Sequence, residues 1–289
     1  MPLPVSYLNG EYLPLAEARV SPLDRAFLFG DAVYEVVPVY AGRAFRLREH
    51  LDRLVRSLAG IRMEPPLTHT EWDGILHTLI ERNGGGDQYV YFQVTRGAEL
   101  ARNHAWPAGL APTVFAFANP LEPVSPALLD QGLATITAQD IRWARRDIKS
   151  TALLANTLLK KLAVDAGAFE TILLERGELT EGSSTTVHVI QGGEIHTPPN
   201  GHHILPGTTR DVVTELAARS GIPSASRRVT EGELRAADEI WLAFSTRGVL
   251  PVTRLDGKPV RTGKPGPLFE RIYAAFVSYV RELAGTPAL

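Results

Sequence analysis

The chain has 289 residues, 44% of them apolar, and this length and composition favour a globular protein with two domains. Thirty Lys and Arg residues against 32 Asp and Glu residues give a formal charge of -2, so no strong field favours binding to nucleic acid or to an anionic membrane. The chain lacks cysteine, which excludes disulfides, thiolate nucleophiles and Cys-ligated metals. No signal peptide and no apolar run of roughly 18–20 residues is present. We expect a soluble, cytoplasmic protein that binds small molecules.

The first part of the chain alternates short strands and helices. The pair Asn9-Gly10 predicts a tight hairpin turn. Apolar residues at helical spacing predict helices over 47–61 and 70–83. Runs of β-branched and aromatic residues predict strands over 32–47, 88–97 and 112–120. A polar, irregular loop is expected over 98–112.

Prolines are concentrated at 117–126, and this stretch is the candidate linker between domains. The predicted organisation is a small N-terminal domain over 1–117, a linker over 118–126 and a larger C-terminal domain over 127–289. In the larger domain we expect helices over 151–166, 207–221 and 267–283, and strands over 134–139, 169–198 and 238–260. Ser150 is the expected N-cap of the first of these helices. The fold class is α+β with mixed sheets.

Lys149 differs from the other two lysines of RWARRDIKSTALLANTLLKK. Lys160 and Lys161 lie near the C-terminal end of the predicted helix, where solvated lysines are favourable. Lys149 precedes the helix and follows three arginines, and both features disfavour its ammonium form. A lysine of this kind can act as a Schiff-base nucleophile and as a proton shuttle. An exposed surface cation is the alternative.

Two further segments are candidates for binding an anion. Thr208 and Thr209 follow Gly207 at the start of a predicted helix, where backbone N–H groups and hydroxyls can bind a phosphate. Ordinary N-capping by either threonine is the alternative. Arg53, on the helix over 47–61, could supply a cation, although an arginine on a helix surface is most often solvated.

Glu181 and the Arg102-x-His104 pair complete the set of candidate residues. Glu181 precedes a run of small hydroxyl residues and could lie beside a protonated ring nitrogen, or it could belong to a polar turn. Arg102 and His104 are two residues apart, so in an extended segment both point the same way and could bind a carboxylate. The pair can also arise by chance in a basic loop.

Four histidines, at 188, 196, 202 and 203, form a group that could suggest a metal site. They lack the spacing of a known ligand set and an evident carboxylate partner. We therefore predict that no metal is bound and that these histidines are surface or half-buried strand residues.

Together, LFGDAVYEVVPVYAGRAFRLREHLDRLVRS, VTRGAELARNHAWP, RWARRDIKS, TEGSS and LPGTTRD resemble the fold type IV class of pyridoxal-phosphate aminotransferases over most of the chain. The resemblance implies a small α/β sandwich followed by a larger domain with a β-barrel-like mixed sheet. It implies that Lys149 carries pyridoxal 5'-phosphate covalently and that Glu181 faces the pyridine nitrogen. Arg53, Thr208 and Thr209 are implied to bind the phosphate, and so is Thr246 in AFSTRG.

The Arg102-x-His104 pair, with Tyr34, resembles the carboxylate-binding residues of D-amino acid aminotransferases. In that group Arg and His reach across from the neighbouring subunit, which implies a homodimer with shared sites. The expected activity is transfer of the amino group of D-alanine, D-glutamate or D-aspartate to a 2-oxo acid by a ping-pong mechanism. Four alternatives remain: a branched-chain L-amino acid transaminase, an R-amine transaminase, an aminodeoxychorismate lyase and a non-catalytic pyridoxal-phosphate-binding module.

Overall fold

The computed structural model describes residues 1–285, which form two compact units. Unit 1 contains Met1–Glu122 and Ile148–Leu153, and unit 2 contains Pro123–Asp147 and Leu154–Glu282. The chain therefore returns to unit 1 for six residues around Lys149 before it continues in unit 2. The domain boundaries expected from the sequence stay a prediction, and by its contacts Lys149 belongs to unit 1. No helix of the described chain is long and apolar enough to cross a membrane.

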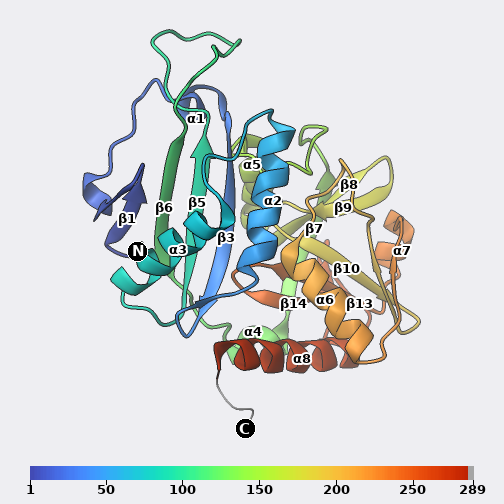
Figure 1. Cartoon of the computed structure of the whole chain (residues 1–289). Coiled ribbons are helices and arrows are strands. Elements are labelled where there is room, and N and C mark those ends of the chain that lie inside the picture. Colours follow the sequence, from blue (N-terminus) through green and yellow to red (C-terminus); the bar gives the residue numbers. More distant parts are fainter. Residues whose placement is uncertain (286–289) are drawn as a thin grey trace. The chain divides into compact units, whose positions relative to one another are not determined.

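Unit 1 is built on an antiparallel six-stranded sheet with the order β2-β1-β6-β5-β3-β4 (Figure 1). The strands are β1 (Val5–Leu8), β2 (Glu11–Pro14), β3 (Ala32–Tyr40), β4 (Arg43–Ala44), β5 (Gln88–Thr95) and β6 (Thr113–Pro120). The predicted hairpin is confirmed, with Asn9 and Gly10 both at positive φ between β1 and β2. Helices α2 (Leu47–Gly60) and α3 (His69–Arg82) cover one face of the sheet and form an apolar core with it.

Two short helices of unit 1 were not predicted, a 3-10 turn over Leu15–Glu17 and α1 over Arg25–Phe29. The side chain of Asp24 caps α1 by accepting from the backbone N–H of Ala26 at 2.8 Å, and Gly30 ends the helix at φ +66°. A helix of five residues is too short for an apolar period to be recognised, so its caps are its only local signal.

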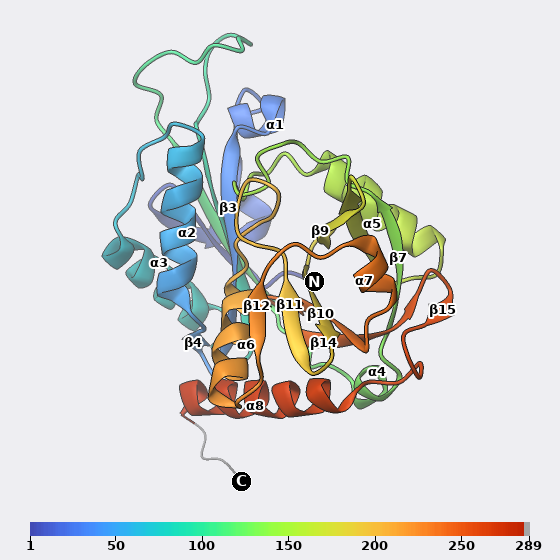
Figure 2. The ribbon, with the colours of Figure 1, turned by 90° about the vertical axis from the view of Figure 1, so that its right-hand side faces the viewer.

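Unit 2 contains a nine-stranded mixed sheet that curls like part of a barrel (Figure 2). Its order is β12-β11-β10-β13-β14-β7-β8-β9, and β15 pairs with β14. The strands are β7 (Leu133–Gln139), β8 (Glu170–Glu175), β9 (Glu178–Gly182), β10 (Thr186–Gln191), β11 (Glu194–Thr197), β12 (Ser224–Ser226), β13 (Glu239–Phe244), β14 (Gly248–Leu255) and β15 (Lys258–Pro259). The helices are α4 (Pro126–Gln131), α5 (Leu154–Asp165), α6 (Thr208–Arg219), α7 (Glu231–Arg235) and α8 (Pro267–Ala284). The α+β class is confirmed.

Two sequence-based details can be compared with the structure. The predicted strand over 112–120 is confirmed as β6, and its residues 118–120, which the linker prediction also includes, pair with β5. The second detail is wrong: Ser150 does not cap a helix, because α5 begins four residues later at Leu154. Instead, the backbone of this segment pairs with β3: Ser150 bridges to Val33, and the N–H of Thr151 donates to Ala32 at 3.0 Å. Pairing to the sheet therefore overrides the local capping signal.

Candidate active site

Lys149 is held by its backbone on two sides within unit 1. Its carbonyl accepts a hydrogen bond from the N–H of Tyr34 in β3 at 2.9 Å, and its N–H donates to the hydroxyl of Ser57 in α2 at 3.1 Å. The side chain is half-buried, and its Nζ lies 4.4 Å from the centre of the Tyr34 ring. Because both backbone groups are fixed, the amine is presented at a defined place above an aromatic face. Lys149 is thus not an ordinary solvated surface lysine.

Arg53 is buried rather than solvated, with 2% of its surface exposed. Its Nε and Nη2 donate to the two carboxylate oxygens of Glu35 at 2.7 Å each, and the imidazole Nδ1 of His50 lies 2.7 Å from the same carboxylate. Burial would raise the pKa of the Glu35 carboxyl, but Arg53 and His50 hold that pKa well below its usual range. The carboxylate fixes the plane of the guanidinium, so unit 1 contains a rigid, permanently charged cation.

Burial lowers the pKa of His50, and the positive charges of Arg53 and Lys149 lower it further. The carboxylate of Glu35 raises this pKa, but the net effect is a lowering. The imidazole is therefore neutral near pH 7. Because the ionised carboxylate of Glu35 can only accept, we assign the Nδ1–H tautomer to His50.

Tyr34 lies on the sheet face opposite the helices, whereas its neighbour Glu35 faces the helices, as the alternation of a strand requires. The Tyr34 ring stacks on Tyr91 of β5, with centroids 5.4 Å apart and planes 23° apart. Burial and, to a smaller extent, Tyr34 raise the pKa of Tyr91, whose hydroxyl donates to the side-chain oxygen of Gln93 at 2.7 Å. Tyr34 is therefore part of an ordered aromatic face.

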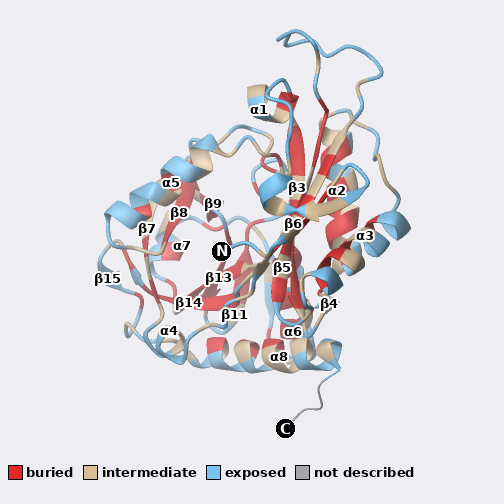
Figure 3. Cartoon of the chain, turned by 90° about the vertical axis from the view of Figure 1, so that its left-hand side faces the viewer, coloured by how far each residue is buried: buried red, intermediate tan, exposed pale blue. Residues whose placement is uncertain are grey.

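Arg102 and His104 are exposed on the loop between β5 and β6. The exposed colour along this loop is plain in Figure 3. The Arg102 guanidinium carbon lies 4.9 Å from the centre of the Phe29 ring, and the His104 ring lies 5.3 Å from it. Within the described chain their ring contacts are thus with α1. The structure brings the two residues together, as predicted, but not to Tyr34 or Lys149 of the same chain.

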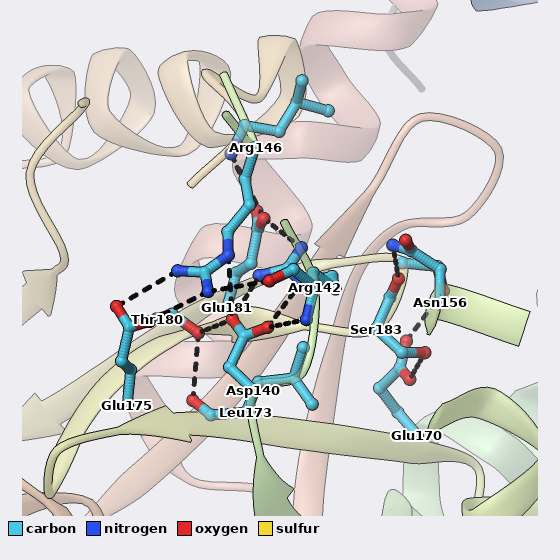
Figure 4. Close-up of polar contacts among 12 residues, drawn as sticks. Asp140, Arg142, Arg146, Asn156, Glu170, Leu173, Glu175, Thr180, Glu181 and Ser183 are labelled. Carbon is cyan, nitrogen blue, oxygen red and sulfur yellow. Dashed lines mark hydrogen bonds and ion pairs between the residues drawn. The ribbon is translucent and has the colours of Figure 1, made fainter. Parts of the chain in front are cut away.

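Glu181 is a buried residue of β9 in unit 2 and not part of an exposed polar turn. Its carboxylate accepts from Arg142 Nη1 at 2.5 Å and from the N–H of Leu205 at 3.2 Å (Figure 4). Asp140 binds the same guanidinium, at 2.7 Å to Nη2. Burial raises the pKa of Glu181, and Arg142 opposes this rise only in part. A carboxyl with a raised pKa can share a proton with a basic ring nitrogen.

The start of α6 has the features of an anion site. Its N-cap is Gly207, which makes no side-chain capping hydrogen bond, and Thr208 and Thr209 open the helix as buried residues. The alternative that a threonine caps the helix is therefore wrong. A Cβ at Gly207 would lie 2.7 Å from the hydroxyl of Thr186, so the close approach requires glycine. Thr246 is half-buried in the turn between β13 and β14.

Two of the four histidines considered as metal ligands contact other side chains. His188 Nδ1 lies 2.8 Å from the hydroxyl of Thr197, and His203 Nδ1 lies 3.2 Å from the carboxylate of Glu175. Among residues 1–285, no group of three or more His, Asp or Glu side chains is arranged to hold a metal ion.

The partners of Arg53 and Glu181 were missed in the sequence. Glu35 is a charged residue at an inward position of an otherwise apolar strand, and that position is a recognisable signal. His50, Arg53 and Ser57 follow helical spacing on the buried side of α2, which also could have been read. Asp140 and Arg142 gave no comparable signal, because their pairing with Glu181 depends on how β7 and β9 are arranged.

Unit 1 therefore offers a fixed amine, a buried cation and an aromatic face, and unit 2 offers a buried carboxyl and a helix start suited to an anion. A pyridine that carries an aldehyde and a phosphate requires groups of this kind. An amine can form a covalent bond to the aldehyde, a helix start can bind the phosphate, and a carboxyl can pair with the ring nitrogen.

The family model described as amino-transferase class IV matches residues 32–255 of the chain. A D-alanine aminotransferase from Bacillus licheniformis is 40% identical over 268 residues, which cover 92% of this chain and 94% of the relative. A D-alanine aminotransferase from Staphylococcus aureus (strain MSSA476) is 37% identical over 276 residues, covering 95% and 97%.

Solved structures of branched-chain amino acid aminotransferases have a similar fold. The enzyme from Escherichia coli superimposes with a TM-score of 0.90 at 26% identity, covering 96% of this chain and 94% of the other. The enzyme from Thermoproteus uzoniensis, with norvaline, has a TM-score of 0.86 at 26% identity, covering 97% and 95%. A further branched-chain enzyme, solved with pyridoxamine 5'-phosphate, has a TM-score of 0.90 at 27% identity, also covering 97% and 95%.

Proposed function

The chain belongs to the class IV aminotransferase family, and from this premise we propose that it transfers the amino group of a D-amino acid to a 2-oxo acid with pyridoxal 5'-phosphate. The observation that carries the proposal is the fixed amine of Lys149, held by Tyr34 and Ser57 with its Nζ over the Tyr34 ring. The identity of 35–40% to D-alanine aminotransferases supports the choice of donor.

The residues of each unit fit the proposed cofactor in charge and in hydrogen-bonding chemistry. In unit 1, Lys149 would hold it covalently and Arg53 would bind its phosphate. In unit 2, Glu181 would face the ring nitrogen, and Thr208, Thr209 and Thr246 would bind the phosphate. The fit rests on two observations: the buried carboxyl of Glu181 has a raised pKa, and Gly207 leaves the start of α6 without a side-chain cap.

When bound, pyridoxal phosphate supplies an electron sink for the electron pair released at the substrate α-carbon. Glu181 strengthens that sink by sharing the proton of the ring nitrogen, and Arg142 keeps the carboxyl oriented. Lys149 Nζ would act as the base that takes the substrate α-proton and, as the conjugate acid, would deliver it to a carbon other than the α-carbon. Release of one 2-oxo acid precedes binding of the next, which makes the cycle ping-pong.

For the substrate we propose D-alanine, D-glutamate or D-aspartate, with the α-carboxylate bound by Tyr34, Arg102 and His104. Arg102 and His104 contact Phe29 and are exposed, which fits residues that serve the site of a second subunit. We therefore propose a homodimer with shared sites. Exposed apolar side chains support it: Phe27, Leu100 and Trp106 in unit 1, and Leu154, Leu158 and Leu162 along α5.

We also propose a cytoplasmic location and the domain division 1–117, 118–126 and 127–289. The first rests on the absence of cysteine, which fits a reducing compartment. The second rests on the concentration of prolines between the two sheets.

A branched-chain or R-amine transaminase is supported less well. The branched-chain structures share the fold at TM-scores near 0.9, but at 26–28% identity, whereas D-alanine aminotransferases reach 40%. A lyase or a non-catalytic cofactor-binding module does not explain why Arg102 and His104 accompany Lys149 and Glu181.

The first experiment offers D-alanine, L-leucine and R-1-phenylethylamine to the purified, cofactor-loaded protein, each with 2-oxoglutarate and with pyruvate. Turnover of D-alanine but not of the other two donors is the expected result. Preferential turnover of L-leucine would overturn the D-specific assignment and leave the aminotransferase family intact.

Sharing of sites is tested at a low D-alanine concentration, where Lys149→Ala and Arg102→Ala should each show little or no activity, by mixing the two variants. If Arg102 serves the neighbouring subunit, the mixed dimer contains one site with both residues intact, and activity returns on subunit exchange. If Arg102 served its own chain, no site of the mixed dimer would be complete and the mixture would stay inactive.

A further inference from the structure

The loop between β5 and β6 is held by one buried arginine that the proposed chemistry does not use. Arg25 of α1 is 3% exposed, and it donates through Nη1 to the carbonyl of Asn103 at 2.6 Å and through Nη2 to the carbonyl of His104 at 3.1 Å. We propose that Arg25 is a positioning residue that fixes the main chain at His104 and thereby orients the pair Arg102 and His104. The inference rests on the proposed role of that pair in binding carboxylate.

Arg25 is itself held in place by two carboxylates. Its Nε donates to Asp31 at 2.8 Å, and Asp31 also accepts from Arg96 Nε at 2.8 Å and Nη2 at 3.0 Å. Arg25 Nη1 forms a further ion pair with Glu99 at the start of the loop. An arginine whose donors are divided between carboxylates and carbonyls has few rotamers left, so it can transmit the position of α1 to the loop.

Hydrogen bonds and a close backbone approach fix the two ends of the loop where they join the sheet. The conformation of the outer part therefore needs a separate explanation. The N–H of Arg25 donates to the carbonyl of Gly97 at 2.9 Å. Gly97 has φ +98°, and a Cβ there would lie 1.9 Å from the carbonyl oxygen of Ala111. Asp24 accepts from the hydroxyls of Thr95 and Thr113, one on each leg, at 2.8 and 2.7 Å.

Beyond these two ends, residues 100–109 are exposed, so burial does not determine their conformation. Apart from its contacts with aromatic rings, the segment carrying Arg102 and His104 is held through the two carbonyls that Arg25 binds. Phe29 gathers the same groups: its ring centre lies 4.6 Å from the guanidinium carbon of Arg25, 4.9 Å from that of Arg102 and 5.3 Å from the His104 ring. The orientation of Arg102 and His104 thus depends on the two hydrogen bonds from Arg25 to the carbonyls of Asn103 and His104, which we call the clamp.

A shift of about 1 Å in a positioned group can reduce catalysis about 100-fold. Loss of the clamp should therefore raise KM for a carboxylate-bearing donor by roughly 10–100-fold. It should leave attachment of the cofactor at Lys149 intact, because the contacts of Lys149 are with Tyr34 and Ser57.

The test compares Arg25→Met, Arg25→Lys and Arg96→Met in the cofactor-loaded enzyme. Arg96→Met is the control: it removes a similarly buried guanidinium from Asp31 and from the ring of Trp106 in the loop, but leaves both carbonyl bonds of Arg25 in place. KM and kcat for D-alanine, the melting temperature and the fraction of cofactor fixed by borohydride are measured for each. We expect a raised KM with normal cofactor fixation in Arg25→Met, a smaller rise in Arg25→Lys, and nearly unchanged KM in Arg96→Met despite a similar loss in melting temperature.

Equal KM values in Arg25→Met and Arg96→Met at equal loss of melting temperature would overturn the inference, because Arg25 would then be only a structural anchor. If Arg25→Met does not fold, Arg25→Lys decides in the same way, since a lysine keeps the charge beside Asp31 but cannot grip both carbonyls. Arg102→Ala and His104→Ala are assayed in parallel. If KM is unchanged in these two variants, the proposed carboxylate-binding role is itself overturned. If KM is raised in them but not in Arg25→Met or Arg25→Lys, only the inference about Arg25 is overturned.

Discussion

Glu35 binds Arg53 through both carboxylate oxygens, each at 2.7 Å from a guanidinium nitrogen, and neither residue is exposed by more than 2%. A bidentate pair of this kind fixes the orientation of a charge that would otherwise be costly to bury. The proposed phosphate contact of Arg53 therefore depends on a residue of β3 that does not itself need to touch the ligand.

Replacing Glu35 with Gln should lower the free energy of unfolding by about 3–5 kcal/mol, because it leaves Arg53 buried beside a neutral partner. Affinity for pyridoxal phosphate should fall with it. Urea unfolding and a cofactor titration measure the two effects. Glu49→Gln is the control, since Glu49 is exposed and its ion pair with the half-buried Arg46 should be worth at most about 1 kcal/mol. A Glu35→Gln protein as stable as the control would show that the buried pair does not hold this part of unit 1.

The same pair predicts a pH dependence of stability. The pKa of Glu35 in the folded chain lies below its ordinary value of 4.5, so the carboxylate stabilises the fold fully above that pH. This contribution should be lost as the pH falls below 4.5, and the loss should be absent in Glu35→Gln. Unfolding free energies measured across the acid range would test it, and parallel curves for the two proteins would contradict it.

Lys149→Ala should abolish transamination and prevent borohydride from fixing the cofactor. The loss in kcat should be at least about 10²–10⁴-fold, the usual effect of removing a positioned acid–base group. Lys161→Ala, which removes an exposed lysine paired with Asp165, should leave both properties unchanged. Full turnover by Lys149→Ala would exclude this residue as the acid–base group.

Glu181→Gln should slow transamination by about 10²-fold or more, since it removes the charge proposed to stabilise a protonated ring nitrogen. The cofactor should still be fixed by borohydride at Lys149, so the loss lies in the chemical step and not in attachment. Stopped-flow measurement of the half-reaction with D-alanine separates the two. Glu178→Gln, on the same strand and partly exposed, is the matched control. If the half-reaction rate of Glu181→Gln is unaltered, Glu181 does not contact the ring nitrogen.

His188 should make unit 2 sensitive to acid. Burial, and secondarily the charge of Arg210, lower the pKa of His188 from 6.5 to about 3, so the folded chain keeps it neutral. Stability is then complete above pH 6.5 and should decline between pH 6.5 and about 3, at up to about 1.4 kcal/mol per pH unit. His188→Gln should flatten this decline, whereas His203→Gln, at an exposed position, should not. Equal slopes in all three proteins would contradict the assignment.

The parts of the candidate site that could be predicted are those encoded locally. Thr208 and Thr209 follow a glycine at a helix start, and the amphipathic pattern predicts the bounds of α2, α3 and α6 to within two residues. The pairing of Glu35 with Arg53 could not be predicted, because it joins a strand to a helix 18 residues away through tertiary packing. Ser150 shows the reverse case: a valid local capping signal is lost because the segment pairs with β3.

Strand β3 carries Tyr34 on one face and Glu35 on the other. A single-residue insertion or deletion within the strand would exchange the faces of every following side chain. It would bring an aromatic ring to Arg53 and a carboxylate to the amine of Lys149. We therefore expect this strand to change during evolution by substitution alone, with its length constant.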